Sequence, residues 1–272
     1  MLNAAALASL VGSIVVLVLF ATDSRELLGV SVWEKPLKFL ISATFYATTF
    51  SWLYTFVEKG KGLASKMGNV IALMLIVELV VIVGMASVGS TSHFNVSTPF
   101  NIAIWSLMAT AISIVWLATF SLSTGLWNSQ IMSADLRLAV RWSIGLGLAG
   151  MGIAFTMTPP QPQQVLPENW AGIAGAHTVG AADGGPGLPF LGWSTQAGDL
   201  RISHFLGLHA LQVLPLIAVV SSILVTNYFV RRAIIMGAGV AYALLIAFTY
   251  VQALLGETIV QPSTLIFLGI IL

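Results

Sequence analysis

The sequence predicts an all-α integral membrane protein, built as a seven-helix transmembrane bundle with a long outer loop. Of its 272 residues, 57% are hydrophobic and only 8% are charged, whereas soluble proteins carry roughly 25% charged residues. Uncharged apolar runs of about 18 to 20 residues recur, which is the length a helix needs to cross a bilayer. One long connection, residues 158–202, is rich in proline and glycine. We therefore expect a single transmembrane domain over residues 1–272, capped by the 158–202 loop.

Each expected span is an apolar run that ends at polar or helix-breaking residues. The first run lacks the positive start of a secretory signal, so we expect it to be a retained helix. The spans are expected at 3–22, 37–57, 68–89, 101–123, 138–157, 203–226 and 233–255. The ten residues after Pro262 are too few to cross alone, which predicts a re-entrant or surface helix or the start of an eighth.

Loop charges predict the orientation, because cytoplasmic loops of membrane proteins carry an excess of Lys and Arg. The basic residues of the loops after the second, fourth and sixth spans are Lys59, Lys61, Lys66, Arg137, Arg141, Arg231 and Arg232. The other three loops hold a larger share of acids. We therefore expect a cytoplasmic N-terminus and outward-facing loops after the first, third and fifth spans.

Composition also limits the chemistry. The net charge is +1, and no basic patch is interleaved with exposed aromatic residues, which argues against nucleic-acid binding. Because the chain has no cysteine, a metal would have to be held by imidazole, carboxylate or backbone oxygen. The expected environment is the lipid bilayer, with a small molecule, a lipid or partner membrane subunits as the remaining candidate partners.

All four histidines are expected on the outer side of the membrane. They are His93, His177, His204 and His209. Such a set could bind zinc or copper, or ligate haem, with Asp183, Asp199 or Glu34 as oxygen ligands or supporting groups. However, His204 and His209 are five residues apart, about 140° around a regular helix, so they share a site only if the helix begins after His204.

Two further interpretations of these histidines remain open. In the first, they are ordinary hydrogen-bonding residues: His204 and Arg201 contact the loop, while His209 and Gln212 bond to a neighbouring helix. In the second, one or more of them titrates and moves protons.

Glu78 lies near the middle of the third expected span, in "LMLIVELVVIVGM". A buried carboxylate is costly in a membrane, so this residue is protonated, paired or faces an aqueous cavity. We interpret it as a catalytic, ligand-binding or proton-handling acid, and a structural hydrogen bond by the neutral acid is the alternative. Gln212, Gln252, Tyr250 and Lys38 are its candidate partners.

Cationic residues at the outer ends of the spans could bind an anionic headgroup or substrate. Lys35 and Lys38 precede and enter the second span, and Arg201 precedes the sixth. The other predicted substrate-binding residues are Asp183, Asp199, Gln212 and Gln252. The alternative is that the two lysines are snorkelling anchors.

Three segments carry a resemblance. "KPLKF" (35–39), "SHFNVSTPF" (92–100) and "GWSTQAGDLRISHFLGLHALQVLPL" (192–216) resemble segments of uncharacterised bacterial multi-spanning membrane proteins. The resemblance covers under a fifth of the chain and implies a location in the bacterial inner membrane, with no activity attached. The seven-span zinc hydrolases of the ceramidase type do not match, since their last span holds a histidine pair and this one has no histidine.

The function predicted first is a membrane-embedded metal or haem site, redox or hydrolytic, that uses some of the four histidines with Glu78 as its acid. Whether the protein is an enzyme stays open. The alternatives are a small proton- or cation-coupled transporter that uses Glu78, and an accessory subunit of a larger membrane complex.

Overall fold

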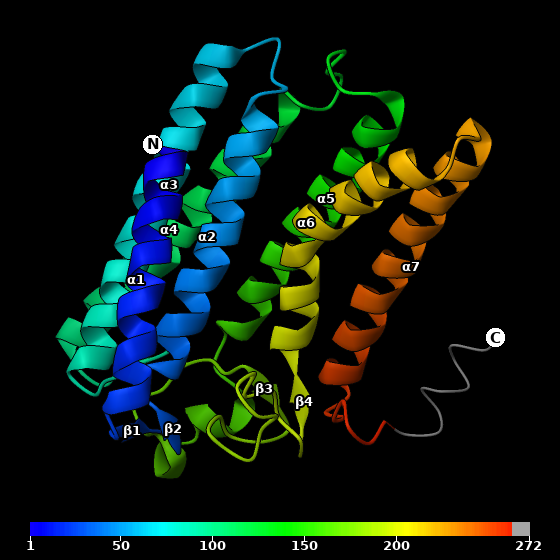
Figure 1. Cartoon of the computed structure of the whole chain (residues 1–272). Coiled ribbons are helices and arrows are strands. Elements are labelled where there is room, and N and C mark those ends of the chain that lie inside the picture. Colours follow the sequence, from blue (N-terminus) through cyan, green and yellow to red (C-terminus); the bar gives the residue numbers. More distant parts are fainter. Residues whose placement is uncertain (263–272) are drawn as a thin grey trace.

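The computed structural model describes residues 1–262, and that part of the chain contains seven long helices (Figure 1). They are α1 (Leu2–Thr22), α2 (Glu34–Tyr54), α3 (Lys61–Ser87), α4 (Pro99–Thr124), α5 (Ala134–Ile153), α6 (Leu200–Leu224) and α7 (Tyr228–Leu254). All except α2 are long and apolar enough to cross a membrane. The all-helical prediction is confirmed, while the expected short segment after Pro262 lies outside the described residues.

The helices form two groups that stand side by side in Figure 1. In the first group, α1 packs closely along α2 and α3 along α4; in the second, α6 packs between α5 and α7. Contacts between the groups are sparser and involve mainly α2 with α6 and α4 with α5. The two groups are therefore packed less tightly against each other than the helices are within each group.

N-cap side chains explain where four helices begin. The residues Thr98, Ser133, Asp199 and Asn227 each accept a hydrogen bond from a backbone N–H two or three residues later. Such bonds satisfy N–H groups that have no partner inside the helix. Each of these helices starts a few residues before its expected span, because its first residue is set by the capping side chain and not by the start of the apolar run.

Helix α6 differs from its expected form in two ways. It begins at Leu200, three residues before the expected span, so Arg201 belongs to the helix as well as His204. Pro215 lies inside α6, where the missing N–H and the proline ring break the regular hydrogen-bond pattern. Figure 1 shows α6 bending at mid-length, which separates the half that carries the histidines from the half that ends at Leu224.

Residues 154–199, which we name the cap segment, lie at one end of the bundle (Figure 1). The segment holds three short 3-10 turns, at Ala154–Met157, Pro162–Val165 and Pro167–Asn169. Its strands β3 (Thr178–Val179) and β4 (Gly198–Asp199) pair antiparallel, with Thr178 opposite Asp199. The hairpin of β1 (Glu26–Leu27) and β2 (Val30–Ser31) lies at the same end of the bundle.

The cap segment also pairs with the loop between α3 and α4. Ile173 forms a bridge with Asn95, Val96 N–H donates to Gly172 O at 2.8 Å, and Ala174 N–H donates to Phe94 O at 2.8 Å. Gly172 has a φ of +71°, and a Cβ added there would lie 2.6 Å from the Ser97 side chain. This pairing therefore requires glycine and brings the loop that carries His93 against the cap segment.

Candidate functional site

Six titratable side chains from five parts of the chain meet at the cap end of the bundle. We name them the polar cluster: Lys35 on α2, Glu78 on α3, His93 in the α3–α4 loop, His177 and Asp183 in the cap segment, and His204 on α6. Electrostatic interactions connect Lys35 to Glu78, Asp183, His93 and His177. His177 in turn interacts with His93 and His204. The structure thus brings together residues that the sequence analysis singled out separately.

Lys38 connects α2 to the cap segment through an ion pair and two hydrogen bonds. Its Nζ forms an ion pair with Glu34 Oε1 at 2.8 Å, one helical turn earlier, and donates to Phe190 O at 3.0 Å and Leu191 O at 3.1 Å. An ammonium has three donors, and all three are engaged. Lys38, predicted as part of a cationic rim for a substrate, is therefore a link between α2 and the cap segment.

Arg201 is engaged in the same way at the start of α6. Its guanidinium binds Asp199 through Nε and NH2, at 2.9 and 2.6 Å, and NH2 also donates to Gly192 O at 2.5 Å. Asp199 is 2% exposed and also accepts from Ser194 N–H at 2.8 Å. Both residues were predicted to bind substrate, and here they fasten the cap segment to α6.

Asp183 fixes the ring of His177. The carboxylate lies 2.6 Å from His177 Nδ1 and accepts hydrogen bonds from the backbone N–H groups of His177 and Thr178 and from Thr178 Oγ1. Burial alone would raise the pKa of Asp183, but these bonds outweigh it and lower the pKa. An ionised Asp183 requires a proton on Nδ1, so a neutral His177 presents the lone pair of Nε2.

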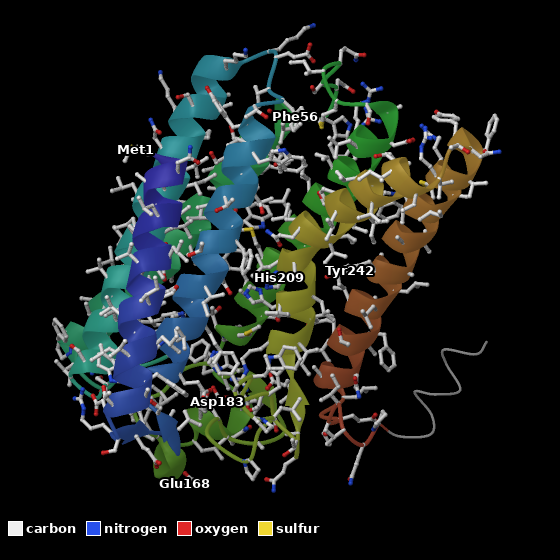
Figure 2. The ribbon with its side chains drawn as sticks, viewed as in Figure 1. Met1, Phe56, Glu168, Asp183, His209 and Tyr242 are labelled. Atoms are coloured by element: carbon white, nitrogen blue, oxygen red, sulfur yellow. The ribbon has the colours of Figure 1, made fainter. Side chains whose placement is uncertain are left out.

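His204 and His209 point to different partners along α6. His204 Nδ1 lies 2.7 Å from Gly150 O on α5, and because a carbonyl oxygen only accepts, Nδ1 carries the proton. His209 packs against Phe205, with 4.1 Å between the ring centres and the rings tilted by 53°, and interacts with the Gln212 side chain. Gln212 Nε2 donates to Thr49 Oγ1 of α2 at 2.9 Å. Figure 2 shows His209 between α2 and α6, facing the junction of the two helix groups.

His93 lies within a group of aromatic rings. Its ring centre is 5.8 Å from Phe39, 5.4 Å from Trp105 and 6.1 Å from Phe94, and Phe94 is 4.9 Å from His177. Burial, with smaller contributions from Lys35 and His177, holds the pKa of His93 well below its usual value. Phe94 has a φ of +62°, which is rare for a residue with a side chain. The pairing of its carbonyl with the cap segment maintains this conformation.

Glu78 is the buried acid of the cluster. It is 6% exposed, and its Oε1 has no hydrogen-bond partner among residues 1–262. Lys35 is the charged residue that interacts with it. Within the same described range Lys35 makes no ion pair or hydrogen bond, and its Nζ lies 5.8 Å from the ring centre of Phe39. Lys35 and Glu78 therefore interact electrostatically, without a hydrogen bond or ion pair between them in the described residues.

Gln252 lies elsewhere. It is 3% exposed on α7, and its Nε2 donates to Thr258 O at 3.0 Å, which closes the C-terminal end of that helix. Tyr250, a candidate partner of Glu78, packs in an apolar group around Phe94 and Leu200. These two residues are thus explained by contacts close to the end of α7.

The described residues contain no group of three or more His, Asp or Glu side chains arranged to hold one metal ion. The regular start of α6 at Leu200 also leaves His204 and His209 on different faces of one helix. His177 and His204 nevertheless resemble metal-ligating histidines in one respect. Each has Nδ1 in a hydrogen bond, which leaves Nε2 available to a ligand. Metal and haem binding remain predictions.

Aromatic residues of the cluster were not foreseen from the sequence. Phe39, Phe94 and Trp105 come from three segments, and only the folded chain shows that they share one site. The resembling segments 35–39 and 92–100 do contain two of them, which is the one signal that the sequence offered.

No family model, curated protein or solved structure matches this chain. The function must therefore be argued from the site itself.

Proposed function

We propose that this protein is a proton-coupled membrane transporter in which Glu78 gains and loses the coupling proton. The observation that carries the proposal is the buried Glu78 carboxyl, whose Oε1 lacks a hydrogen-bond partner in the described residues. An acid kept for structure alone would be expected to have its hydrogen bonds satisfied. Ionisable residues within spans commonly mark proton or ion pathways.

The surroundings of Glu78 support this role. Lys35 compensates the negative charge when Glu78 is ionised, and the polar cluster continues from Lys35 to the cap end through His93 and His177. Glu78 also lies on α3, in the first helix group, whereas His204 lies on α6 in the second. A proton exchange at this junction could be coupled to movement of one group against the other.

The expected setting is the bacterial inner membrane, with all seven helices spanning it and the cap segment outside. The six apolar helices and α2 alternate in direction, and basic residues gather at the end opposite the cap segment. Under this proposal α2 crosses as well, although it is less apolar, because its polar side chains such as Thr49 face α6.

The proposal is tested by proton flux into proteoliposomes that contain a pH-sensitive dye. Small organic anions, amines and sugars are supplied outside in turn, under an imposed pH gradient. Glu78→Gln should reduce the solute-dependent flux at least tenfold, because an amide cannot exchange a proton. Glu26→Gln, an exposed carboxyl at the same end of the bundle, is the matched control and should keep full flux. Flux that survives Glu78→Gln, or that never exceeds protein-free liposomes, would contradict the proposal.

A second candidate is the metal or haem site, and the fixed tautomers of His177 and His204 favour it. Metal analysis and an absorption spectrum of the purified protein test it. Stoichiometric metal or a haem absorption band that is lost in His177→Ala would support this function, and the absence of both would remove it.

A further inference from the structure

Four cations lie at the cap end of the described chain, and only Lys35 is free to bind a ligand. Arg25 is paired with Asp23 at 2.7 Å and donates to Ser87 O at 2.8 Å. Lys38 and Arg201 are engaged by carboxylates and cap-segment carbonyls. Lys35 has no ion pair or hydrogen bond within the described chain. Its ammonium therefore offers donors that a ligand could use, and it interacts electrostatically with Glu78, whose Oε1 has no hydrogen-bond partner among residues 1–262.

From this arrangement we infer that the polar cluster binds a small organic monoanion, with its carboxylate on Lys35 and its apolar part against the aromatic rings. The inference rests on the proposed function and names its substrate class.

Two carboxyl groups in the described chain interact electrostatically with Lys35, those of Asp183 and Glu78. The carboxylate of Asp183 is already held by His177 and Thr178. Glu78 accepts no such bonds from the residues that the structure describes. In a medium of low dielectric constant, one cation stabilises one nearby anion well and two anions poorly. Lys35 can thus compensate an ionised Glu78, or a bound anion while Glu78 is protonated.

Binding of the anion and protonation of Glu78 are therefore linked. Each event favours the other by the same factor, as linkage requires. An anion and a proton would occupy the site together, and together they add no net charge. This is a physical basis for symport, because a neutral pair crosses the bilayer at a lower electrostatic cost than a lone anion.

The aromatic rings define the rest of the ligand. Lys35 Nζ lies over Phe39, and ring contacts lead from Phe39 through His93 to Trp105 and Phe94. These faces suit an apolar or aromatic group next to the carboxylate. Neutral His177 and His204 present lone pairs, so they would repel a second anionic group, which favours a monoanion.

The test is equilibrium binding of radiolabelled benzoate to the purified full-length protein at about pH 5.5 and about pH 8, a range above the usual pKa of carboxylic acids. Wild type should bind at least tenfold more tightly at the lower pH. Glu78→Gln, which mimics the protonated acid, should bind with similar affinity at both. A pH dependence that persists in Glu78→Gln would assign the titration to Lys35, the histidines or Asp183 and overturn the linkage.

Lys35→Gln should weaken benzoate binding roughly tenfold or more at both pH values, the contribution of a charge-assisted hydrogen bond. Lys35→Arg should retain most of it. Lys61→Gln, an exposed lysine at the opposite end, is the matched control, and benzamide tests whether the charge is needed. No benzoate binding by folded wild type, or equal binding by Lys35→Gln, would overturn the inference.

These results are separable from the proposed function. Benzoate binding that requires Lys35 and depends on Glu78, without any Glu78-dependent proton flux, would leave the anion site standing and remove transport. Proton flux that requires Glu78 but is driven by another solute, without benzoate binding, would do the reverse.

Discussion

Gly150 on α5 and Gly207 on α6 are in direct backbone contact. A Cβ added at Gly207 would lie 2.3 Å from Gly150 Cα, and one added at Gly150 would lie 2.5 Å from Gly207 Cα. Small residues allow such close approach between transmembrane helices, which are held together mainly by packing. The same contact places Gly150 O where His204 Nδ1 donates to it at 2.7 Å, so helix packing positions a residue of the polar cluster.

Replacing Gly207 with alanine should therefore separate α5 from α6. We expect destabilisation of about 1–3 kcal/mol, the usual range for overpacking, measured as a lower thermal midpoint in detergent. Gly152→Ala is the control, since a Cβ there would meet nothing within 4 Å. Equal thermal midpoints for the two variants would show that the two helices are not in contact at these glycines.

The lowered pKa of His93 predicts how the stability of the folded protein depends on pH. Burial holds the pKa of His93 well below the usual value of about 6.5. Below about pH 6.5, His93 is therefore protonated in the unfolded chain but remains neutral in the folded chain. The stability contributed by neutral His93 is complete above that pH and declines as the pH falls towards the folded-state pKa. The slope is at most about 1.4 kcal/mol per pH unit.

Thermal midpoints measured from about pH 7.5 down to about pH 5 should reveal this loss. His93→Phe should flatten the curve, because its ring cannot take up a proton, while the neighbouring aromatic rings keep a similar partner. A wild-type curve that stays level, or a variant curve as steep as that of wild type, would assign the acid sensitivity elsewhere.

An ion pair at the end opposite the cap segment joins α5 to α7. Arg231 Nε lies 2.7 Å from Asp135 Oδ2, and Asp135 is 6% exposed. Breaking a buried pair by removing one partner leaves an uncompensated charge and costs about 3–5 kcal/mol. We expect Arg231→Met to lower the thermal midpoint strongly and the double variant with Asp135→Leu to recover much of the loss. A double variant as unstable as the single one would mean that the pair contributes little through its charge.

The helices could be predicted from the sequence, but their ends could not. The length of apolar runs determines the helices, and so their number and approximate positions were predictable. The ends of the helices are less predictable, because a helix can continue through charged residues beyond its apolar run. For example, α3 begins at Lys61, well before its expected span, since lysine is compatible with a helix that extends beyond the membrane. Local signals thus mark the middle of each helix better than its start.

The candidate site was predictable only in part. Glu78 and the histidines are unusual in such an apolar chain, which is why the sequence singles them out. The separate roles of Lys35 and Lys38 depend on which lysine meets the carbonyls of Phe190 and Leu191, a contact more than 150 residues distant in sequence. Spacing within one helix cannot supply that information.

The orientation and the span count can be tested together, because the chain has no cysteine and single cysteines can be introduced freely. Ala182→Cys lies in the cap segment, Glu26→Cys precedes α2, and Ser65→Cys lies near the start of α3, all at exposed positions. A membrane-impermeant maleimide should label Ala182→Cys and Glu26→Cys from outside, and Ser65→Cys only after the membrane is opened, because seven spans place Ser65 on the cytoplasmic side. Labelling of Glu26→Cys and Ser65→Cys from the same side would show that α2 does not cross. Labelling of Ser65→Cys alone from outside would reverse the orientation and place the cap segment, with Lys35 and the imidazoles, in the cytoplasm.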